Sequence, residues 1–174
     1  MSVKEAIEAG DSVALREMLA ASPHLADELI VWGKDCEIRT HPLHYVSDVS
    51  FTGKLSSEAA VELVETLLRA GANVNFVAAN GETALIGAAS LHAEQVGLRL
   101  IAAGAKIDSR GKFEETALHW AAHEGQSLLV EALVAAGSDL TLRDRQYKAT
   151  PLEWAEHGGK EQAAAILKRA AAVK

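Results

Sequence analysis

Apolar residues along the chain follow a helical period that itself recurs every 33 residues. Leu129, Val130, Leu133 and Val134 have the i, i+1, i+4, i+5 spacing that places side chains on one stripe of a helix. Equivalent stripes lie one and two periods earlier, at Val96, Gly97, Leu100 and Ile101 and at Leu63, Val64, Leu67 and Leu68. Each stripe precedes an Ala-Gly pair, whose glycines are Gly71, Gly104 and Gly137. The sequence therefore predicts three successive copies of one structural unit.

A second, shorter helix is predicted ahead of each stripe. Around residues 116–123, the Thr116 hydroxyl can cap the first turn, and Gly125 can end the helix in a left-handed conformation. In the last copy Pro151 follows Thr150, at the first helical position, where proline is tolerated. Because one helix pair cannot bury its apolar stripe alone, we expect the pairs to stack side by side around a shared core.

The succession Thr-x-Leu-His, Ala-Ala, Gly, Leu-Val and Ala-Gly across residues 116–140 resembles the ankyrin repeat. Residues 78–110 match this pattern well, and residues 41–75 and 144–170 match it in part. The resemblance implies an all-α solenoid in which helix-turn-helix units are joined by short β-hairpins. We expect a single domain over residues 1–174 with about five units, two of them degenerate caps: roughly 2–35 (cap), 36–77 (with insertions), 78–110, 111–143 and 144–174 (cap).

The N-terminal part of the chain departs from the period in two places. From Leu19 to Leu43 the chain takes 24 residues where the regular units take 17, so seven extra residues fall near residues 30–39, as an enlarged hairpin or an extra helical turn. From Leu43 to Leu85 it takes 42 residues instead of 33, and we expect these nine extra residues between the two helices of the second unit, around residues 47–57. The insertions either seal the end of the stack, with Trp32 and Phe51 buried, or contact a partner.

Two further expectations concern packing. In the first unit, residues 2–21, the second helix begins after Asp11 and carries an apolar set of Val13, Leu15, Met18 and Leu19. In the third unit Gly97 stands where the neighbouring units have valine, and a glycine inside a helix costs about 1 kcal/mol relative to alanine. We therefore expect Gly97 to permit close approach of a larger neighbour, either Leu63 or Leu129.

Composition restricts the classes of function. With 49% hydrophobic and 24% charged residues among 174, the chain suits one folded domain. A formal charge of −7 opposes binding to nucleic acid, which Lys and Arg drive by releasing counterions. No apolar run reaches the roughly 18 residues of a membrane span, and the first residues carry carboxylates that a signal peptide would lack. Cys36 is the only cysteine, which excludes an internal disulfide, and we expect an inert or surface thiol and a cytoplasmic location.

The histidines carry the main chemical candidates. His119 and His123 lie four residues apart on one predicted helix, a spacing that can hold a metal, and Glu124 follows. The metalloprotease motif requires a Glu directly after its first His, where this chain has Trp120. The ankyrin resemblance instead implies a structural role for His119 and His44, with hydrogen bonds to the backbone and to the threonine hydroxyl. We expect no metal, cofactor or catalytic residue, and the least favoured alternative is a metal-dependent protein or enzyme built on His119, His123, Glu124 and His157.

His123 and His157 lie 34 residues apart, at equivalent positions on the predicted exposed side of successive inner helices. Their imidazoles could form a row that titrates near neutral pH and binds a partner, or they could simply be solvated.

The resemblance also implies a binding surface, because partners of ankyrin domains commonly bind the concave face formed by hairpin tips and inner helices. We expect a non-enzymatic protein-protein interaction module that binds a protein or peptide on this face and is a monomer when free; the alternative is a structural or self-associating assembly component. Mapped onto this chain, the concave face comprises Asp48, Ala79, Asn80, Glu82, Ser90, Leu91, Lys112, Phe113, Glu115, His123, Glu124, Arg145, Gln146, Tyr147, Lys148 and His157.

Overall fold

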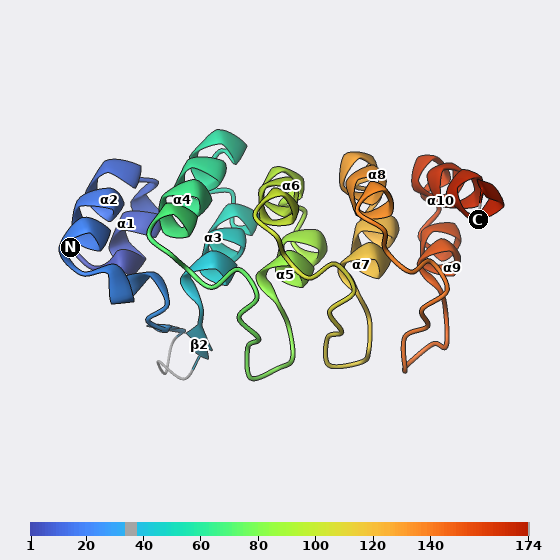
Figure 1. Cartoon of the computed structure of the whole chain (residues 1–174), viewed down its shortest axis with the longest axis horizontal. Helices are drawn as coiled ribbons and strands as arrows, with labels where there is room; N and C mark the ends of the chain where they lie inside the picture. Colours follow the sequence, from blue (N-terminus) through green and yellow to red (C-terminus); the bar gives the residue numbers. More distant parts are fainter. Residues whose placement is uncertain (34–37, 174) are drawn as a thin grey trace.

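The computed structural model describes residues 1–33 and 38–173, which form a row of stacked helix pairs (Figure 1). In each pair a shorter inner helix lies beside an outer helix, and the loops between pairs project on one side of the row. The predicted all-α ankyrin-like solenoid is confirmed. The inner helices are α1 (Val3–Ala9), α3 (Pro42–Phe51), α5 (Ala84–Ser90), α7 (Ala117–Glu124) and α9 (Pro151–His157), and the outer helices are α2 (Ser12–Ala21), α4 (Ser57–Arg69), α6 (Glu94–Ala102), α8 (Ser127–Ala135) and α10 (Glu161–Val173).

The inner helices begin and end at the residues that the pattern marks. The Thr150 hydroxyl accepts a hydrogen bond from the Glu153 N–H at 3.3 Å, and Pro151 follows as the first helical residue. The Thr83 hydroxyl accepts from the Ile86 N–H in the same way. Gly125 ends α7 with φ of 74°, a left-handed conformation that other residues adopt at a cost. Local capping therefore marks where these inner helices begin and end.

A continuous apolar interior connects the units. Leu67, Leu100 and Leu133 come from successive outer helices that pack on one another, and each is fully buried. Gly97 lets two of these helices approach closely, since a Cβ atom there would lie 2.9 Å from both terminal methyl carbons of Leu129. This confirms the prediction that Gly97 permits the close approach of a larger neighbour, and Leu129 is such a neighbour. Burial across the interfaces between units is the main source of the fold's stability.

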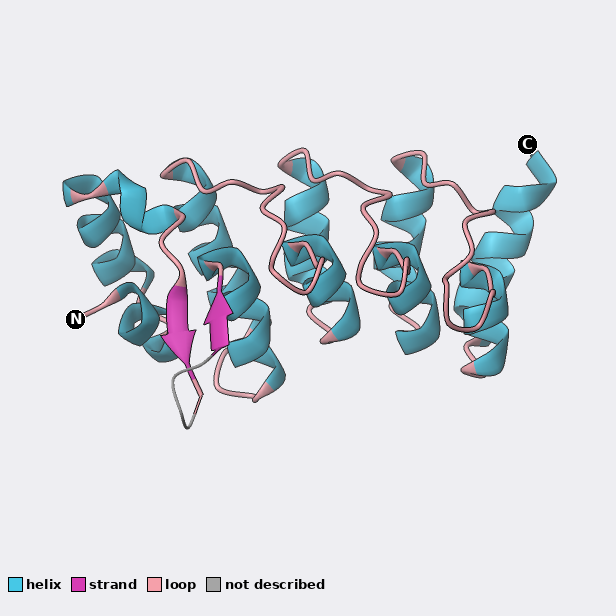
Figure 2. Ribbon diagram, turned by 90° about the horizontal axis from the view of Figure 1, so that it is seen from below, coloured by secondary structure: helices cyan, strands magenta, loops and turns pink. Residues whose placement is uncertain are grey.

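The first insertion forms a β-hairpin rather than a helical turn. Strand β1 (Ile30–Trp32) follows the short 3-10 helix η1 (Pro23–Ala26) and pairs antiparallel with β2 (Ile38–Thr40), with Val31 opposite Arg39. Figure 2 shows this hairpin at the N-terminal end of a series of loops that share one orientation. Cys36 belongs to residues 34–37, so the expectation of an inert thiol concerns a residue outside the described ones.

The second insertion mainly lengthens helices, which corrects the prediction that it lies between them. Helix α3 has 10 residues and α4 has 13, where α5 has 7 and α6 has 9. The predicted burial of Phe51 is wrong: this residue ends α3 and is 62% exposed, because the lengthened helix extends beyond its shorter neighbour. Trp32 is only partly buried and packs against Tyr45, with ring centroids 5.6 Å apart. Val13, 58% exposed, also differs from expectation, since α2 has a neighbouring unit on one side only.

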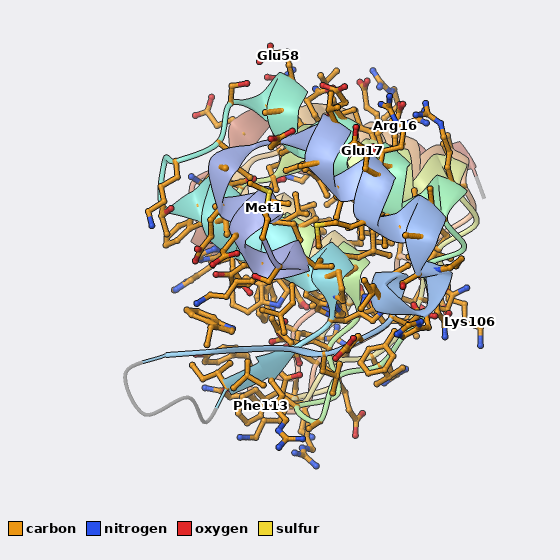
Figure 3. The ribbon with its side chains drawn as sticks, turned by 90° about the vertical axis from the view of Figure 1, so that its left-hand side faces the viewer. Met1, Arg16, Glu17, Glu58, Lys106 and Phe113 are labelled. Carbon is orange, nitrogen blue, oxygen red and sulfur yellow. The ribbon has the colours of Figure 1, made fainter. Side chains whose placement is uncertain are left out.

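None of the helices in residues 1–33 and 38–173 combines the length and apolar character needed to cross a bilayer. Figure 3 looks along the row from its N-terminal end, with the outer helices at the top and the loops at the bottom. Phe113 lies among the loops, and Glu58 lies on the opposite side of the molecule. This arrangement separates the concave face from the outer-helix surface.

Candidate functional site

A groove rich in aromatic side chains lies on the concave face, and we call it the aromatic groove. It has a volume of about 590 Å³ and lies over α7, α9 and the loop that joins their units. Trp154 is at its centre: the centroid of its ring system lies 5.2 Å from that of Trp120, 5.8 Å from that of His123 and 6.0 Å from that of Tyr147. Its lining residues are Trp120, His123, Tyr147, Ala149, Glu153, Trp154 and His157.

This geometry changes the role expected for His123, which is partly buried, and for His157, which is exposed. His123 and His157 both line the aromatic groove, but the aromatic rings in contact with His123 are those of Trp120 and Trp154. Neither tryptophan was identified as a site residue from the sequence. Their 34-residue spacing, equal to that of the histidines, is the signal that places them together on successive inner helices.

Asp144 holds one wall of the aromatic groove in place. This residue is 1% exposed, and its carboxylate accepts hydrogen bonds from the backbone N–H groups of Tyr147 (2.6 Å) and Ala149 (3.0 Å) and from Nε1–H of Trp154 (3.1 Å). Burial alone would raise the pKa of Asp144, but these hydrogen bonds favour the ionised form and lower the pKa. A buried, ionised carboxylate thus fixes both the loop tip and the central indole.

His119 serves as a structural link between units, which confirms the prediction. It is fully buried, and its Nδ1 accepts from the Thr116 N–H at 3.1 Å while lying 2.9 Å from the threonine hydroxyl oxygen. Its Nε2–H donates to the carbonyl oxygen of Ala149 in the next unit. Burial lowers the pKa of His119, so the ring is neutral at pH 7. With both nitrogens engaged in this way, His119 has no ring nitrogen left for a metal.

His44 makes the corresponding link two units earlier in the row. Its Nε2–H donates to the carbonyl oxygen of Glu82 at 3.2 Å, and burial lowers its pKa to about 4. The threonine of the pattern is replaced here by His41, so only the backbone part of the predicted bonding is present. Within residues 1–33 and 38–173, no three His, Cys, Asp or Glu side chains converge as a metal site requires.

Glu124 joins two histidines at the edge of the concave face. One carboxylate oxygen lies 2.9 Å from Nδ1 of His123, and the other lies 2.8 Å from Nε2 of His92. His92 comes from the turn between α5 and α6, where its φ of 57° is left-handed. No sequence signal marks His92, because neither its position nor its spacing repeats in the other units. The carboxylate of Glu124 therefore links His123 to His92, so these three side chains are in contact with one another.

The loop tips present most of the predicted contact residues to solvent. Asn80, Lys112, Phe113, Arg145, Gln146, Tyr147 and Lys148 are exposed, as is His157 on α9, whereas Glu82, Ser90 and Leu91 are partly buried. Neighbouring tips are joined, since Nη2 of Arg145 donates to the carbonyl oxygen of Lys112 at 3.1 Å and the Arg145 N–H donates to that of Phe113. Glu115 is the exception to the prediction. It is 4% exposed, and its carboxylate accepts from the Phe113 N–H at 2.7 Å, so it shapes the tip from inside.

A second hollow, which we call the acidic groove, lies nearer the N-terminal end of the same face. It has a volume of about 440 Å³ between the β1–β2 hairpin and the loop at residues 78–82. Asp48 and Glu82 supply its carboxylates, and burial, followed by the negative charge of Glu82, raises the pKa of Asp48 to about 6. Its lining residues are Trp32, Ile38, Arg39, Thr40, His44, Asp48, Ala78, Ala79, Asn80, Glu82, Gly87, Ser90 and Leu91.

Comparison with known families gives one match that covers more than half of the chain. A family model described as ankyrin repeats (3 copies) matches residues 54–144 and, in a second overlapping placement, residues 93–173. The matched region includes α4 to α10, and therefore the whole aromatic groove.

Proposed function

The chain belongs to the ankyrin-repeat family, and we propose that it is a non-enzymatic module that binds a protein or peptide partner on its concave face. Ankyrin repeats are generally protein-protein interaction modules, which supports the class of function. The partner and the face are our own inference from the geometry of this chain.

The observation that carries the proposal is the aromatic groove and the tip residues around it. Tyr147 is 66% exposed and Phe113 is 42% exposed, although aromatic side chains gain free energy from burial. The fold does not need them, because its stability comes from the interior between the helices. Interface hot spots are enriched in Trp, Tyr and Arg. Trp154 and Tyr147 line the aromatic groove, and Arg145 belongs to the same loop tip as Tyr147 and contacts the preceding tip at Lys112.

The charges at the tips indicate what the partner carries near this anchor. Within the described residues, Lys112, Arg145 and Lys148 have no carboxylate within ion-pair distance. The Lys112 ammonium instead lies 5.5 Å from the centroid of the Phe113 ring. We therefore propose a partner segment with an apolar or aromatic side chain for the groove and a carboxylate for the tips. The single cysteine supports a reducing compartment, and we propose that binding takes place in the cytoplasm.

The test compares a double variant of the tips with a control on the opposite surface. Arg145→Ala with Tyr147→Ala removes two exposed side chains, and Leu128→Ala removes a side chain of similar exposure, 53%, from outer helix α8. Tagged chains are used to recover partners from an extract of the native host, followed by quantitative mass spectrometry. Truncation of a hot-spot residue costs about 2 kcal/mol or more, so the double variant should lose at least about tenfold in recovery, while Leu128→Ala should match the wild type. Equal recovery by the double variant would remove the assignment of this face.

A further inference from the structure

The acidic groove combines apolar walls with two carboxylates that make no ion pair within the described residues, although its lining also includes the cationic Arg39. Trp32, Ile38 and Leu91 form apolar parts of its lining, and Ile38 is 49% exposed. Within the described residues, the side chain of Asp48 makes no hydrogen bond or ion pair, and the same holds for the carboxylate of Glu82. The backbone of Glu82 is engaged, because its N–H donates to Oδ1 of Asn80 and its carbonyl oxygen accepts from His44.

Carboxylates of comparable burial elsewhere in the chain have partners. Glu65 pairs with Arg69 at 2.6 Å and with Arg99 at 3.0 Å, and Glu124 bridges two histidines. Asp48 is half-buried beside a second negative charge and has no ion-pair partner within the described residues. Burial, followed by the charge of Glu82, raises its pKa. An ionised, desolvated carboxylate lowers stability unless an opposite charge comes from elsewhere, and such groups are concentrated at binding sites.

We infer that the acidic groove binds the cationic side chain of a lysine or arginine supplied by the partner. The cationic head lies at Asp48 and Glu82, and the methylene stem lies along Trp32, Ile38 and Leu91, since long cationic side chains bury their stems and keep their heads at polar groups. An organic cation suits this donor set better than a metal ion, because no third ligand of the His, Cys, Asp or Glu type converges there within the described residues. The inference rests on the proposed function, in which a partner covers the concave face, and it adds the chemistry of one contact.

The experiment uses small stand-ins for the two side chains and needs no partner. The ¹⁵N-labelled full chain is titrated with n-butylammonium and with n-butylguanidinium, at constant ionic strength and neutral pH, and chemical shifts are followed by NMR. Butan-1-ol has the same stem without the charge and serves as the ligand control. The expected result is saturable shifts of the Trp32 indole and Ser90 amide signals with a cation and much smaller shifts with the alcohol.

Two variants make the result specific to the groove. Asp48→Asn keeps the shape of the side chain and removes its charge, and it should weaken binding of both cations at least about fivefold. Glu17→Gln removes a charge from the exposed surface of α2, away from the groove (Figure 3), and should leave binding unchanged. If Asp48→Asn does not fold, Glu82→Gln provides the same comparison.

The inference is overturned if Asp48→Asn binds the cations as tightly as the wild type, or if the shifts are spread over exposed acidic residues instead of the groove. That outcome is distinguishable from failure of the proposed function. The tip variants Arg145→Ala and Tyr147→Ala test partner recovery at the other groove, and they leave the binding of a small cation at Asp48 unaffected.

Discussion

Gly97 provides a sharp test of how closely the units pack, because a matched control is available in the preceding helix. A Cβ atom at Gly97 would lie 2.9 Å from two carbons of Leu129, which is fully buried. A Cβ atom at Gly87, within α5, would lie 3.8 Å from the nearest atom, a carbon of His44, which is an ordinary contact distance. Both glycines have ordinary negative φ angles, so alanine introduces no backbone strain at either position.

The two substitutions should therefore differ in their effect on stability, and only Gly87→Ala should stabilise the chain. Alanine is favoured over glycine inside a helix by about 1 kcal/mol at both positions. At Gly97 the added methyl group also overpacks the interface, which costs about 1–3 kcal/mol. We expect Gly87→Ala to stabilise the chain by about 1 kcal/mol, and Gly97→Ala to range from neutral to about 2 kcal/mol destabilising. In a chain of this size, about 1 kcal/mol corresponds to a shift of about 2–4 °C in the melting temperature.

Urea unfolding and thermal melts of the two single variants measure this difference. The double variant Gly97→Ala with Leu129→Ala tests whether contact with the Leu129 side chain is what makes Gly97→Ala unfavourable. With the Leu129 side chain shortened, the new methyl group occupies vacated space, so Gly97→Ala should stabilise that background by about 1 kcal/mol. The account of close packing is wrong if Gly97→Ala stabilises the wild type as much as Gly87→Ala does.

Three further predictions concern the core and its response to pH. Leu133→Ala should cost about 2–5 kcal/mol in urea unfolding, because it opens a cavity between stacked units where the side chain is fully buried, and an unchanged melting temperature would contradict the packing. Burial lowers the folded-state pKa of His41, His44 and His119, and it lowers the pKa of His44 to about 4. The unfolded chain therefore binds more protons than the folded chain in this range, so stability should fall as the pH is lowered from 6.5 toward 4. Asp48 acts in the opposite direction, since its raised pKa makes the folded chain the stronger proton binder between pH 4 and 6. We expect the combined loss of stability from the three histidines to exceed the gain from Asp48. A urea midpoint at pH 5 equal to or above that at pH 7 would contradict this expectation. Asp48→Asn should raise stability at pH 7 by about 1 kcal/mol, because it removes a half-buried charge whose unfavourable energy is partly screened by solvent. A lower melting temperature for this variant would indicate that the ionised carboxylate has a favourable partner in the folded chain.

The stacked architecture could be predicted because the sequence repeats its core positions at a fixed spacing. Leu67, Leu100 and Leu133 occupy one place in the 33-residue period, and all three are fully buried in successive outer helices. Caps at Thr150 and Gly125 could likewise be assigned from residue type alone. The repeat period indicates which side of each helix faces the interior, and this information is sufficient to predict the stacked fold.

The detail of the site depended on contacts that a period does not encode. Glu115 was expected at an exposed tip, yet it folds back over Gly111, whose missing side chain leaves room for the carboxylate. Phe51 is exposed because the insertion lengthened α3 instead of adding a loop, a choice that depends on helix propensity along the whole segment. Trp154 became central to the aromatic groove through its bond to Asp144, a contact across ten residues that no motif indicates.

Photo-crosslinking tests the central claim, partner binding on the concave face, most directly. A photoreactive p-benzoylphenylalanine replaces either Tyr147 on the concave face or Leu128 on the outer surface, two positions with 66% and 53% exposure. After irradiation in an extract of the native host, we predict a discrete covalent adduct with a partner protein from position 147 and none from position 128. An adduct that forms only from position 128, or equally from both, would contradict the account.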